Sequence, residues 1–127
     1  MTWSTEQLDL IGESEELHIT SHRQDGSLRK WIPIWVVRVD DDLYIRSAYG
    51  ADGAWYRHAT AGTARVQVGN FESDATLERV TDAQANDRVA EAYRAKYHNQ
   101  PGALKPMLDA PSAESTVRLV QVATQPM

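Results

Sequence analysis

"WIPIWVVRVDDDLYIRS", residues 31–47, is the stretch of the sequence that decides the fold. Residues 31–39 carry apolar side chains on both faces of an extended chain, so a strand here needs cover from a barrel interior and from a second source, such as another subunit. Three aspartates at 40–42 suit a tight turn, and residues 43–49 return as the next strand. Pro33 has no N–H to donate to a sheet, so the first strand is expected to begin at an edge or a bulge.

Alternating apolar and polar residues on either side of this hairpin predict four more strands. These strands cover residues 16–22, 64–70, 75–80 and 115–124. The dipeptide Asp25-Gly26 is a turn signal, and we expect it to join the strand at 16–22 to the strand at 31–39.

Capping residues and apolar spacing predict helices over 5–12, 54–61 and from 81 to about 97. Ser4 with Gln7, and Thr81 with Gln84, have the spacing of a capping box at the start of the first and the third helix. Residues 98–114 contain three prolines, so we expect a surface loop or lid without regular structure there.

These elements predict a mainly β, α+β fold, a six-stranded antiparallel split β-barrel. It has a short helix between strands 3 and 4 and a longer helix before the last strand. At 127 residues, the chain is expected to form one domain over 1–127. The alternative is another small α+β fold, in which Trp31, Trp35 and Trp55 line an apolar cavity and residues 31–39 and 43–49 are not neighbours in a closed barrel.

The composition excludes several kinds of chemistry and partner. The chain has no cysteine, so disulfides, thiolate metal sites and cysteine nucleophiles are absent. Its net charge of −5 argues against a nucleic-acid partner. The first residues lack a secretory signal and no apolar run matches a membrane span, so we expect a cytoplasmic protein with no membrane partner. No Walker loop, dinucleotide fingerprint or nucleophile elbow is present, and no metal site is predicted.

Two basic segments stand out against this acidic background. Residues 22–38 hold four basic residues and one acid, a net charge of +3, and residues 44–68 hold three and one, a net charge of +2. Together they suit a small anion, with solvated strand edges as the alternative interpretation.

The stretch "RSAYGADGAWYRHA", residues 46–59, places small residues at the start of a predicted helix. Free backbone amides at a helix N-terminus bind phosphate when side chains do not block the approach. The small residues are Gly50, Ala51, Gly53 and Ala54. Arg46 and Ser47 are candidate ligands from the preceding strand, and Arg57 or His58 from the first helical turn. A glycine-rich connection with a core tryptophan is the alternative.

The order of the motifs "SHRQDGSLRKWIP", "IWVVRVDDDLYIRSAYG" and "AWYRHATAGTARVQVG" resembles the flavin- and deazaflavin-binding split-barrel proteins, the pyridoxamine-phosphate-oxidase-like group. Within this group, which includes deazaflavin-dependent nitroreductases, the chain is most similar to an uncharacterised bacterial domain-of-unknown-function family. The resemblance covers nearly the whole chain. Arg23 and Gly26 match a basic turn of the deazaflavin-dependent members, Ser47 matches a serine after a strand, and Trp55 matches a tryptophan.

By this resemblance, several residues would contact the phosphate or the ring edge of FMN or a deazaflavin: Arg29, Lys30, Ser47, Trp55 and Arg57. The resemblance also implies a homodimer with the cofactor in the cleft between subunits. The sequence departs from the usual pattern at His22, which replaces a glycine, and at His58, which replaces an asparagine. The turn is also one residue longer, and Ala-Gly-Thr at 61–63 replaces an Asn-Pro pair.

Two functions follow from these observations. The first is a flavin- or deazaflavin-dependent oxidoreductase that acts on a small molecule, whose cofactor-binding residues are predicted to be Arg29, Lys30, Arg46, Ser47, Gly53, Trp55, Arg57 and His58. In that case His58 or Tyr49 is a candidate proton donor, with a structural hydrogen bond as the alternative role. The second is a cofactor-free barrel that binds another small anionic or aromatic ligand, or a protein partner.

Overall fold

The computed structural model describes residues 3–48 and 50–122. The strands are β1 (Glu16–Ser21), β2 (Ile32–Trp35), β3 (Val37–Val39), β4 (Asp42–Ile45), β5 (Ala64–Val68), β6 (Phe71–Arg79) and β7 (Val117–Gln121). The helices are α1 (Thr5–Glu13), α2 (Ala54–Thr60), α3 (Ala83–Lys96), α4 (Pro101–Met107) and α5 (Ala110–Glu114), and a 3-10 turn, η1 (Gly50–Asp52), precedes α2.

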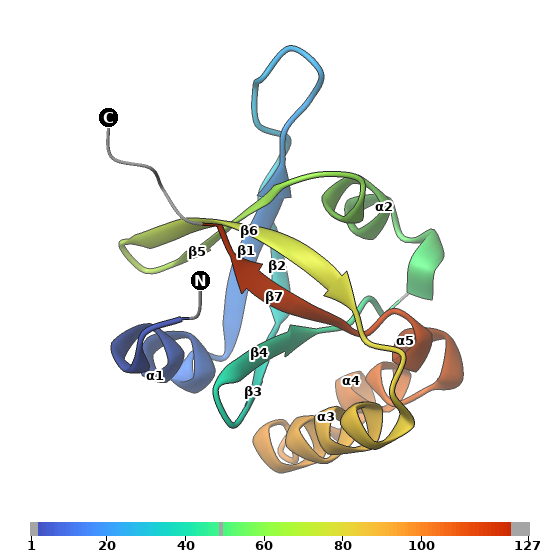
Figure 1. Cartoon of the computed structure of the whole chain (residues 1–127). Coiled ribbons are helices and arrows are strands. Elements are labelled where there is room, and N and C mark those ends of the chain that lie inside the picture. The colour runs from blue at the N-terminus through green and yellow to red at the C-terminus, as the bar shows by residue number, and fades with distance from the viewer. Residues whose placement is uncertain (1–2, 49, 123–127) are drawn as a thin grey trace.

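The strands form one antiparallel sheet in the order β2-β1-β5-β6-β7-β4-β3. The two ends of this order, β2 and β3, are separated in the chain by Val36 alone. The sheet therefore curls until its ends meet in one segment, 32–39, whose first half pairs with β1 and whose second half pairs with β4 (Figure 1). The predicted antiparallel split barrel is confirmed, and the count rises from six strands to seven because this segment divides at Val36. The pairing of β3 with β4 excludes the alternative fold.

Side chains at the end of α3 bond the backbone of Val36, where the segment divides. The Tyr97 hydroxyl accepts from the Val36 N–H at 3.2 Å, and the Lys96 ammonium donates to the Val36 carbonyl at 2.6 Å. The Tyr97 ring also stacks on Trp35, with 3.8 Å between ring centroids and 3° between planes. These contacts replace the strand pairing that the segment loses at this point.

Two apolar clusters stabilise the fold, one on each face of the segment 32–39. The first fills the barrel and includes Ile19, Ile34, Val36, Val66 and Leu119. The second packs α3 and α4 against the outside of β3 and β4, and includes Val37, Tyr44, Val89, Tyr93 and Leu104. The second face of the β3 half, for which another subunit seemed one source of cover, is therefore covered by the chain's own helices.

Residues 98–114 are largely helical, so the prediction of a loop without regular structure is wrong. Pro101 and Pro111 lie in the first turns of α4 and α5, where a missing N–H leaves no helical hydrogen bond unmade. The capping box of Ser4 and Gln7 is confirmed. The cap of α3 is Asp82, one residue later than expected, because its carboxylate accepts from the Ala85 N–H at 3.0 Å.

Pro33 lies at the end of the sheet order, on β2, and is exposed, as its missing N–H predicted. Within residues 3–48 and 50–122, none of the helices has the length and apolar character needed to cross a membrane.

Candidate functional site

Two adjoining clefts lie between α2 and the hairpin that joins β1 to β2. The apolar cleft, of about 180 Å³, is lined by Ile19, Thr20, Ser21, Arg29, Lys30, Ile32, Ala54, Trp55, His58 and Ala59. The basic cleft, of about 380 Å³, is lined by His22, Arg23, Gln24, Arg29, His58, Ala61, Gly62 and Thr63. Because Arg29 and His58 line both clefts, one ligand with an apolar part and an anionic part can reach both.

The hairpin backbone fixes Arg29 at the boundary between the two clefts. The Arg29 N–H donates to the Ser21 carbonyl at 2.9 Å, and the Thr20 hydroxyl donates to the Arg29 carbonyl at 2.7 Å. One guanidinium nitrogen, Nη1, donates to the His22 carbonyl at 2.6 Å and to Ser21 Oγ at 3.2 Å. The Nε and Nη2 donors make no hydrogen bond to the part of the chain that the structure describes, so they are available to an anion.

The one acid of the hairpin, Asp25, is occupied within its own turn. Its carboxylate accepts from the hydroxyl and the backbone N–H of Ser27, at 2.6 and 2.9 Å. These hydrogen bonds, with a smaller contribution from the charge of Arg23, lower the pKa of Asp25. The carboxylate therefore stays ionised at neutral pH and holds the turn, and it lines neither cleft.

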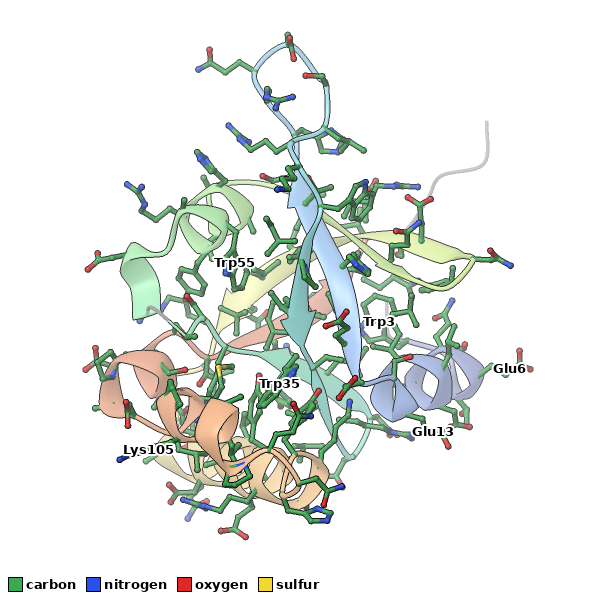
Figure 2. The ribbon with its side chains drawn as sticks, turned by 180° about the vertical axis from the view of Figure 1, so that it is seen from behind. Trp3, Glu6, Glu13, Trp35, Trp55 and Lys105 are labelled. Carbon is green, nitrogen blue, oxygen red and sulfur yellow. The ribbon has the colours of Figure 1, made fainter. Side chains whose placement is uncertain are left out.

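Helix α2 forms the opposite wall through residues three apart. Trp55 and His58 lie on the helix face that lines the apolar cleft, since residues at i and i+3 share a face. Tyr56 and Ala59 are buried, which anchors the helix on the barrel. The Trp55 ring, labelled in Figure 2, meets the Tyr56 ring edge to face with 5.7 Å between ring centroids, and this contact orients the indole.

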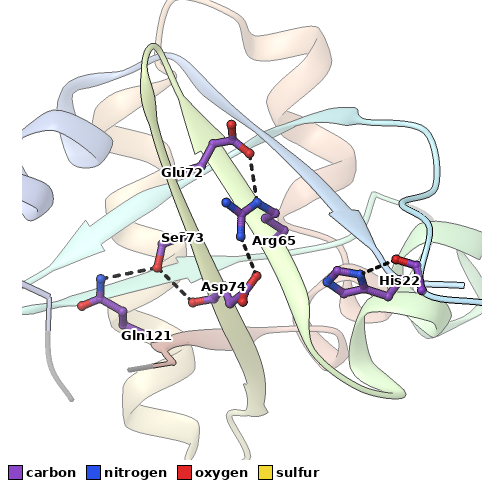
Figure 3. A network of polar contacts seen from close by, with 7 residues as sticks. His22, Arg65, Glu72, Ser73, Asp74 and Gln121 are labelled. Carbon is purple, nitrogen blue, oxygen red and sulfur yellow. Dashed lines mark hydrogen bonds and ion pairs between the residues drawn. The ribbon is translucent and has the colours of Figure 1, made fainter. Parts of the chain in front are cut away.

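The clefts carry an excess of positive charge in an acidic protein. Their linings hold Arg23, Arg29 and Lys30, and no Asp or Glu. None of these three cations forms an ion pair with a residue in the described ranges. In contrast, Arg65 on β5 lies between Glu72 and Asp74, at 3.0 and 2.9 Å (Figure 3). Cations that form no ion pair with the protein are suited to binding an anion.

Arg46 lies elsewhere, in the interior between β4 and the helices. Its side chain is 2% exposed, and burial lowers its pKa. Its guanidinium donates to the Thr116 hydroxyl at 2.8 Å, the Met107 carbonyl at 2.9 Å, and the carbonyl and side-chain oxygens of Asn86 at 3.1 and 3.0 Å. The Tyr93 ring lies 5.6 Å from it. These protein partners occupy the donors that we expected to bind phosphate.

The residues around the N-terminus of α2 also differ from the sequence-based expectation. Ser47 is fully buried, and its N–H donates to the Ser115 hydroxyl at 2.8 Å. Gly50 has a φ of +71°, and a Cβ there would lie 3.2 Å from the Pro111 carbonyl oxygen. The glycine at position 50 is therefore explained by the close packing of α5 against it. It does not provide the open path for a ligand that we expected. Gly53 caps α2 without lining either cleft, and Tyr49 is outside the described residues.

Of the eight predicted residues, the structure brings Arg29, Lys30, Trp55 and His58 together around the apolar cleft. Arg57 is exposed on α2 and lines neither cleft. Sequence reasoning omitted Arg23 and His22 from the site, although both belong to the basic hairpin whose net charge marked it as an anion-binding segment. It also omitted Thr20 and Ser21, for which strand alternation gives no functional signal.

The protein is thus of the split-barrel class, with an apolar cleft and a basic cleft between α2 and the hairpin that joins β1 to β2. A family model described as "Uncharacterized protein conserved in bacteria (DUF2255)" matches residues 7–119, so the chain belongs to this family. The suspected relation to a bacterial family of this fold is confirmed. No match is found among curated proteins.

Solved structures show the same fold at low sequence identity. A conserved hypothetical protein from Mycobacterium tuberculosis has a TM-score of 0.65 and 14% identity, over 99% of this chain and 82% of that chain. An F420 reductase has a TM-score of 0.59 and 14% identity, over 91% and 93%. An FAD-binding protein from Mesorhizobium loti has a TM-score of 0.53 and 20% identity, over 98% and 93%. The similarity therefore lies in the split-barrel fold, which these proteins share.

Proposed function

We propose that this protein binds FMN or a deazaflavin in the paired clefts and acts as an oxidoreductase on a small molecule. The observation that carries the proposal is the continuity of an apolar cleft with a basic cleft through Arg29 and His58. Cofactors of this class join a flat ring to a phosphate, and the two clefts offer separate surfaces for these two parts.

The phosphate belongs in the basic cleft. Arg29 has free Nε and Nη2 donors within the described part of the chain, and Arg23 and His22 stand on the same hairpin. Charge-assisted hydrogen bonds from a guanidinium to phosphate are strong and directional. Lys30, which is exposed at the apolar cleft, adds a further positive charge next to Arg29 in the sequence.

The ring belongs in the apolar cleft, against Trp55. The floor is made of Ile19, Ile32 and Ala59, which exclude water from a bound ring. Thr20 and Ser21 lie at the edge of this floor, and the Thr20 hydroxyl already donates to the Arg29 carbonyl. The residues present thus fit a flat aromatic group better than a sugar or a peptide.

Bound there in its reduced form, such a cofactor supplies a hydride to a small acceptor. The chain's own residues would orient the ring against Trp55 and hold its phosphate through Arg29. His58 lines both clefts, is exposed and has no hydrogen-bond partner among the described residues, so its imidazole is free to hold a proton near the ring edge.

The solved structures of F420 and FAD proteins support a cofactor of this kind through the shared fold. A homodimer also belongs to the proposal, although the chain's own helices cover the β3 half of the segment that suggested it. Sedimentation at low protein concentration tests the dimer, which predicts twice the mass of the 14.2 kDa chain.

The proposal is tested by titrating the purified protein with FMN and with F420, following absorbance and fluorescence. We expect one of them to bind with a dissociation constant in the micromolar range or below. Arg29→Ala should weaken that binding about tenfold or more, since a charged hydrogen bond contributes ~1.5–3 kcal/mol. The matched control is Arg88→Ala on the exposed face of α3, with unchanged affinity expected. Absence of binding to either cofactor would refute the proposal.

A second candidate is a barrel that binds another small anion in place of the cofactor. The sequence departs from the deazaflavin-dependent pattern at His22, at His58, at residues 61–63 and in the length of the turn, and all of the named positions line the basic cleft. The departures would therefore lie where the phosphate is proposed to bind. Binding of phenyl phosphate, lost in Arg29→Ala, with no binding of FMN or F420, would favour this candidate.

A further inference from the structure

We propose that the groove at the split of the barrel binds an uncharged, flat aromatic molecule as the second reactant, next to the cofactor clefts. Its role as a reactant rests on the proposed function, whereas its binding does not. The split groove is lined by the four residues of β2 together with Glu16, Arg46, Ala48, Trp55 and Met107, and has a volume of about 300 Å³.

The groove exists because the segment 32–39 changes partners. β2 pairs with β1 on one edge and has no strand partner on its other edge, within the described residues. Residues 46–48, which follow β4, lie across the gap, and Met107 of α4 and Trp55 of α2 contribute to its lining. The groove is thus a consequence of the barrel's division at Val36.

Its walls are apolar, and one of them is a fixed aromatic plane. Trp35 is only partly buried and is held by its stack on Tyr97, 3.8 Å between centroids. Tyr97 is itself fixed by its hydrogen bonds to the backbone of Val36 and Glu15. Figure 2 shows Trp35 on the α4 side of β2, and Trp55 on α2. Because the Trp35 ring is already held in place, a flat ligand can pack against it without fixing a mobile side chain, which reduces the entropic cost of binding.

The split groove adjoins the apolar cleft, since Ile32 and Trp55 line both. A molecule in the groove and a ring in the apolar cleft would therefore contact the same two side chains. Two binding surfaces that share part of their lining place two reactants next to each other, and a hydride transfer requires such direct contact.

The charges of the groove disfavour an anionic ligand. Its lining holds one acid, Glu16, which is exposed, and one base, Arg46. The Arg46 donors bond to Thr116, Met107 and Asn86, and the residue is 2% exposed. An anionic group would find no exposed cation in the groove, whereas the basic cleft offers several.

The test uses ¹⁵N-labelled protein without cofactor and two probes of similar shape, 2-naphthol and naphthalene-2-sulfonate, at pH 7. The reporter is the indole N–H signal of Trp35, which lines the split groove but neither cleft. We expect 2-naphthol to shift this signal in a saturable way, and the sulfonate to bind there at least tenfold more weakly. No shift with 2-naphthol, or equal affinity for both probes, would overturn the proposal.

A pair of variants locates the probe and separates this proposal from the proposed function. Ala48→Trp fills the groove from an exposed position and should weaken 2-naphthol binding at least tenfold, with FMN or F420 affinity changed less than twofold. Ala83→Trp, on an exposed position of α3, is the matched control and should bind as the unchanged protein does. Normal 2-naphthol binding in Ala48→Trp overturns the groove assignment. Binding of 2-naphthol without any cofactor binding supports the groove and refutes the proposed function.

A second copy of the chain is the competing occupant. Three results together would show this: a dimer for the unchanged protein, a monomer for Ala48→Trp, and no shift of the Trp35 signal with 2-naphthol. In that case the groove is part of a subunit interface and the proposal fails.

Discussion

Arg46 and Arg29 come from the two basic segments of the sequence, yet the fold uses them in opposite ways. Arg46 lies in the interior and donates to Thr116, Met107 and Asn86, so its charge is bonded by the protein itself. Arg29 lies between two clefts whose linings contain no Asp or Glu, and its Nε and Nη2 donors form no hydrogen bond with the described residues. The comparison shows that a basic segment predicts a binding site only when the fold leaves its donors unbonded.

The largest effect expected from this comparison is on stability. Arg46→Met leaves the buried acceptors of Asn86 and Thr116 without their charged donor, so the free energy of unfolding should fall by ~3 kcal/mol. Arg29→Met should lower it by less than ~1 kcal/mol, because Arg29 is only partly buried. Urea unfolding followed by tryptophan fluorescence measures both. Equal losses would show that the two arginines do not differ as described.

The division of the barrel at Val36 gives the next largest effect. Tyr97→Phe removes the hydroxyl that bonds the Val36 and Glu15 backbone, which should cost ~1–2 kcal/mol of unfolding free energy. Tyr44→Phe is the control, since its hydroxyl makes no hydrogen bond with the described residues, and a loss below ~0.5 kcal/mol is expected. A Tyr97→Phe loss as small as the control would mean that the hydroxyl is not needed at the split.

The salt dependence of ligand binding should differ between the basic cleft and the split groove. Raising the ionic strength from about 0.05 to 0.5 M shortens the screening length and should weaken FMN or F420 binding several-fold, because in the proposed function exposed cations would hold the phosphate. Binding of the uncharged 2-naphthol in the groove should change by less than about twofold. Titrations at both salt concentrations test this, and equal salt dependence would argue against two regions of different charge.

The smallest effect concerns Lys96, which bonds the Val36 carbonyl. Burial lowers its pKa to about 8, partly opposed by the charge of Glu15. Above this pH the unfolded chain binds more protons at Lys96 than the folded chain does. The free energy of unfolding should therefore rise slightly from pH about 8 towards 10. Above that range, the raised pKa of Tyr97, about 12, acts in the opposite direction. Lys96→Met should flatten the rise, and an unchanged pH dependence would contradict the lowered pKa.

Much of the fold could be predicted from the sequence, since it follows from local patterns. The apolar segment 31–39, the turn at 40–42 and the edge position of Pro33 all have causes within a few residues. The division at Val36 depends on Tyr97, which is 61 residues away in the chain, and local patterns do not show such a contact. The three prolines of residues 98–114 indicated a loop, but Pro101 and Pro111 lie in the first turns of α4 and α5, where proline is tolerated, and only Pro106 lies inside a helix.

The candidate site could be predicted only in part. Net charge identified the hairpin that carries Arg29 and Lys30, and the resemblance identified Trp55. The burial of Arg46 and Ser47 depends on packing against α3, α4 and α5, so their residue types alone suggested ligands where the structure has internal hydrogen bonds. Gly50 likewise makes room for Pro111.

The central claim is that Arg29 and its neighbours in the basic cleft hold a cofactor phosphate. The most direct measurement compares the dissociation constants of FMN and riboflavin, which differ by the phosphate, for the unchanged protein and for the double variant Arg23→Ala, Arg29→Ala, which removes both arginines of the basic cleft. If FMN is the cofactor, the account predicts that FMN binds the unchanged protein at least about tenfold more tightly than riboflavin does, and that the double variant loses this preference. If the cofactor is F420, the same comparison uses F420 and its phosphate-free deazaflavin. A preference for the phosphate form that survives in the double variant, or no preference in either protein, would contradict the claim.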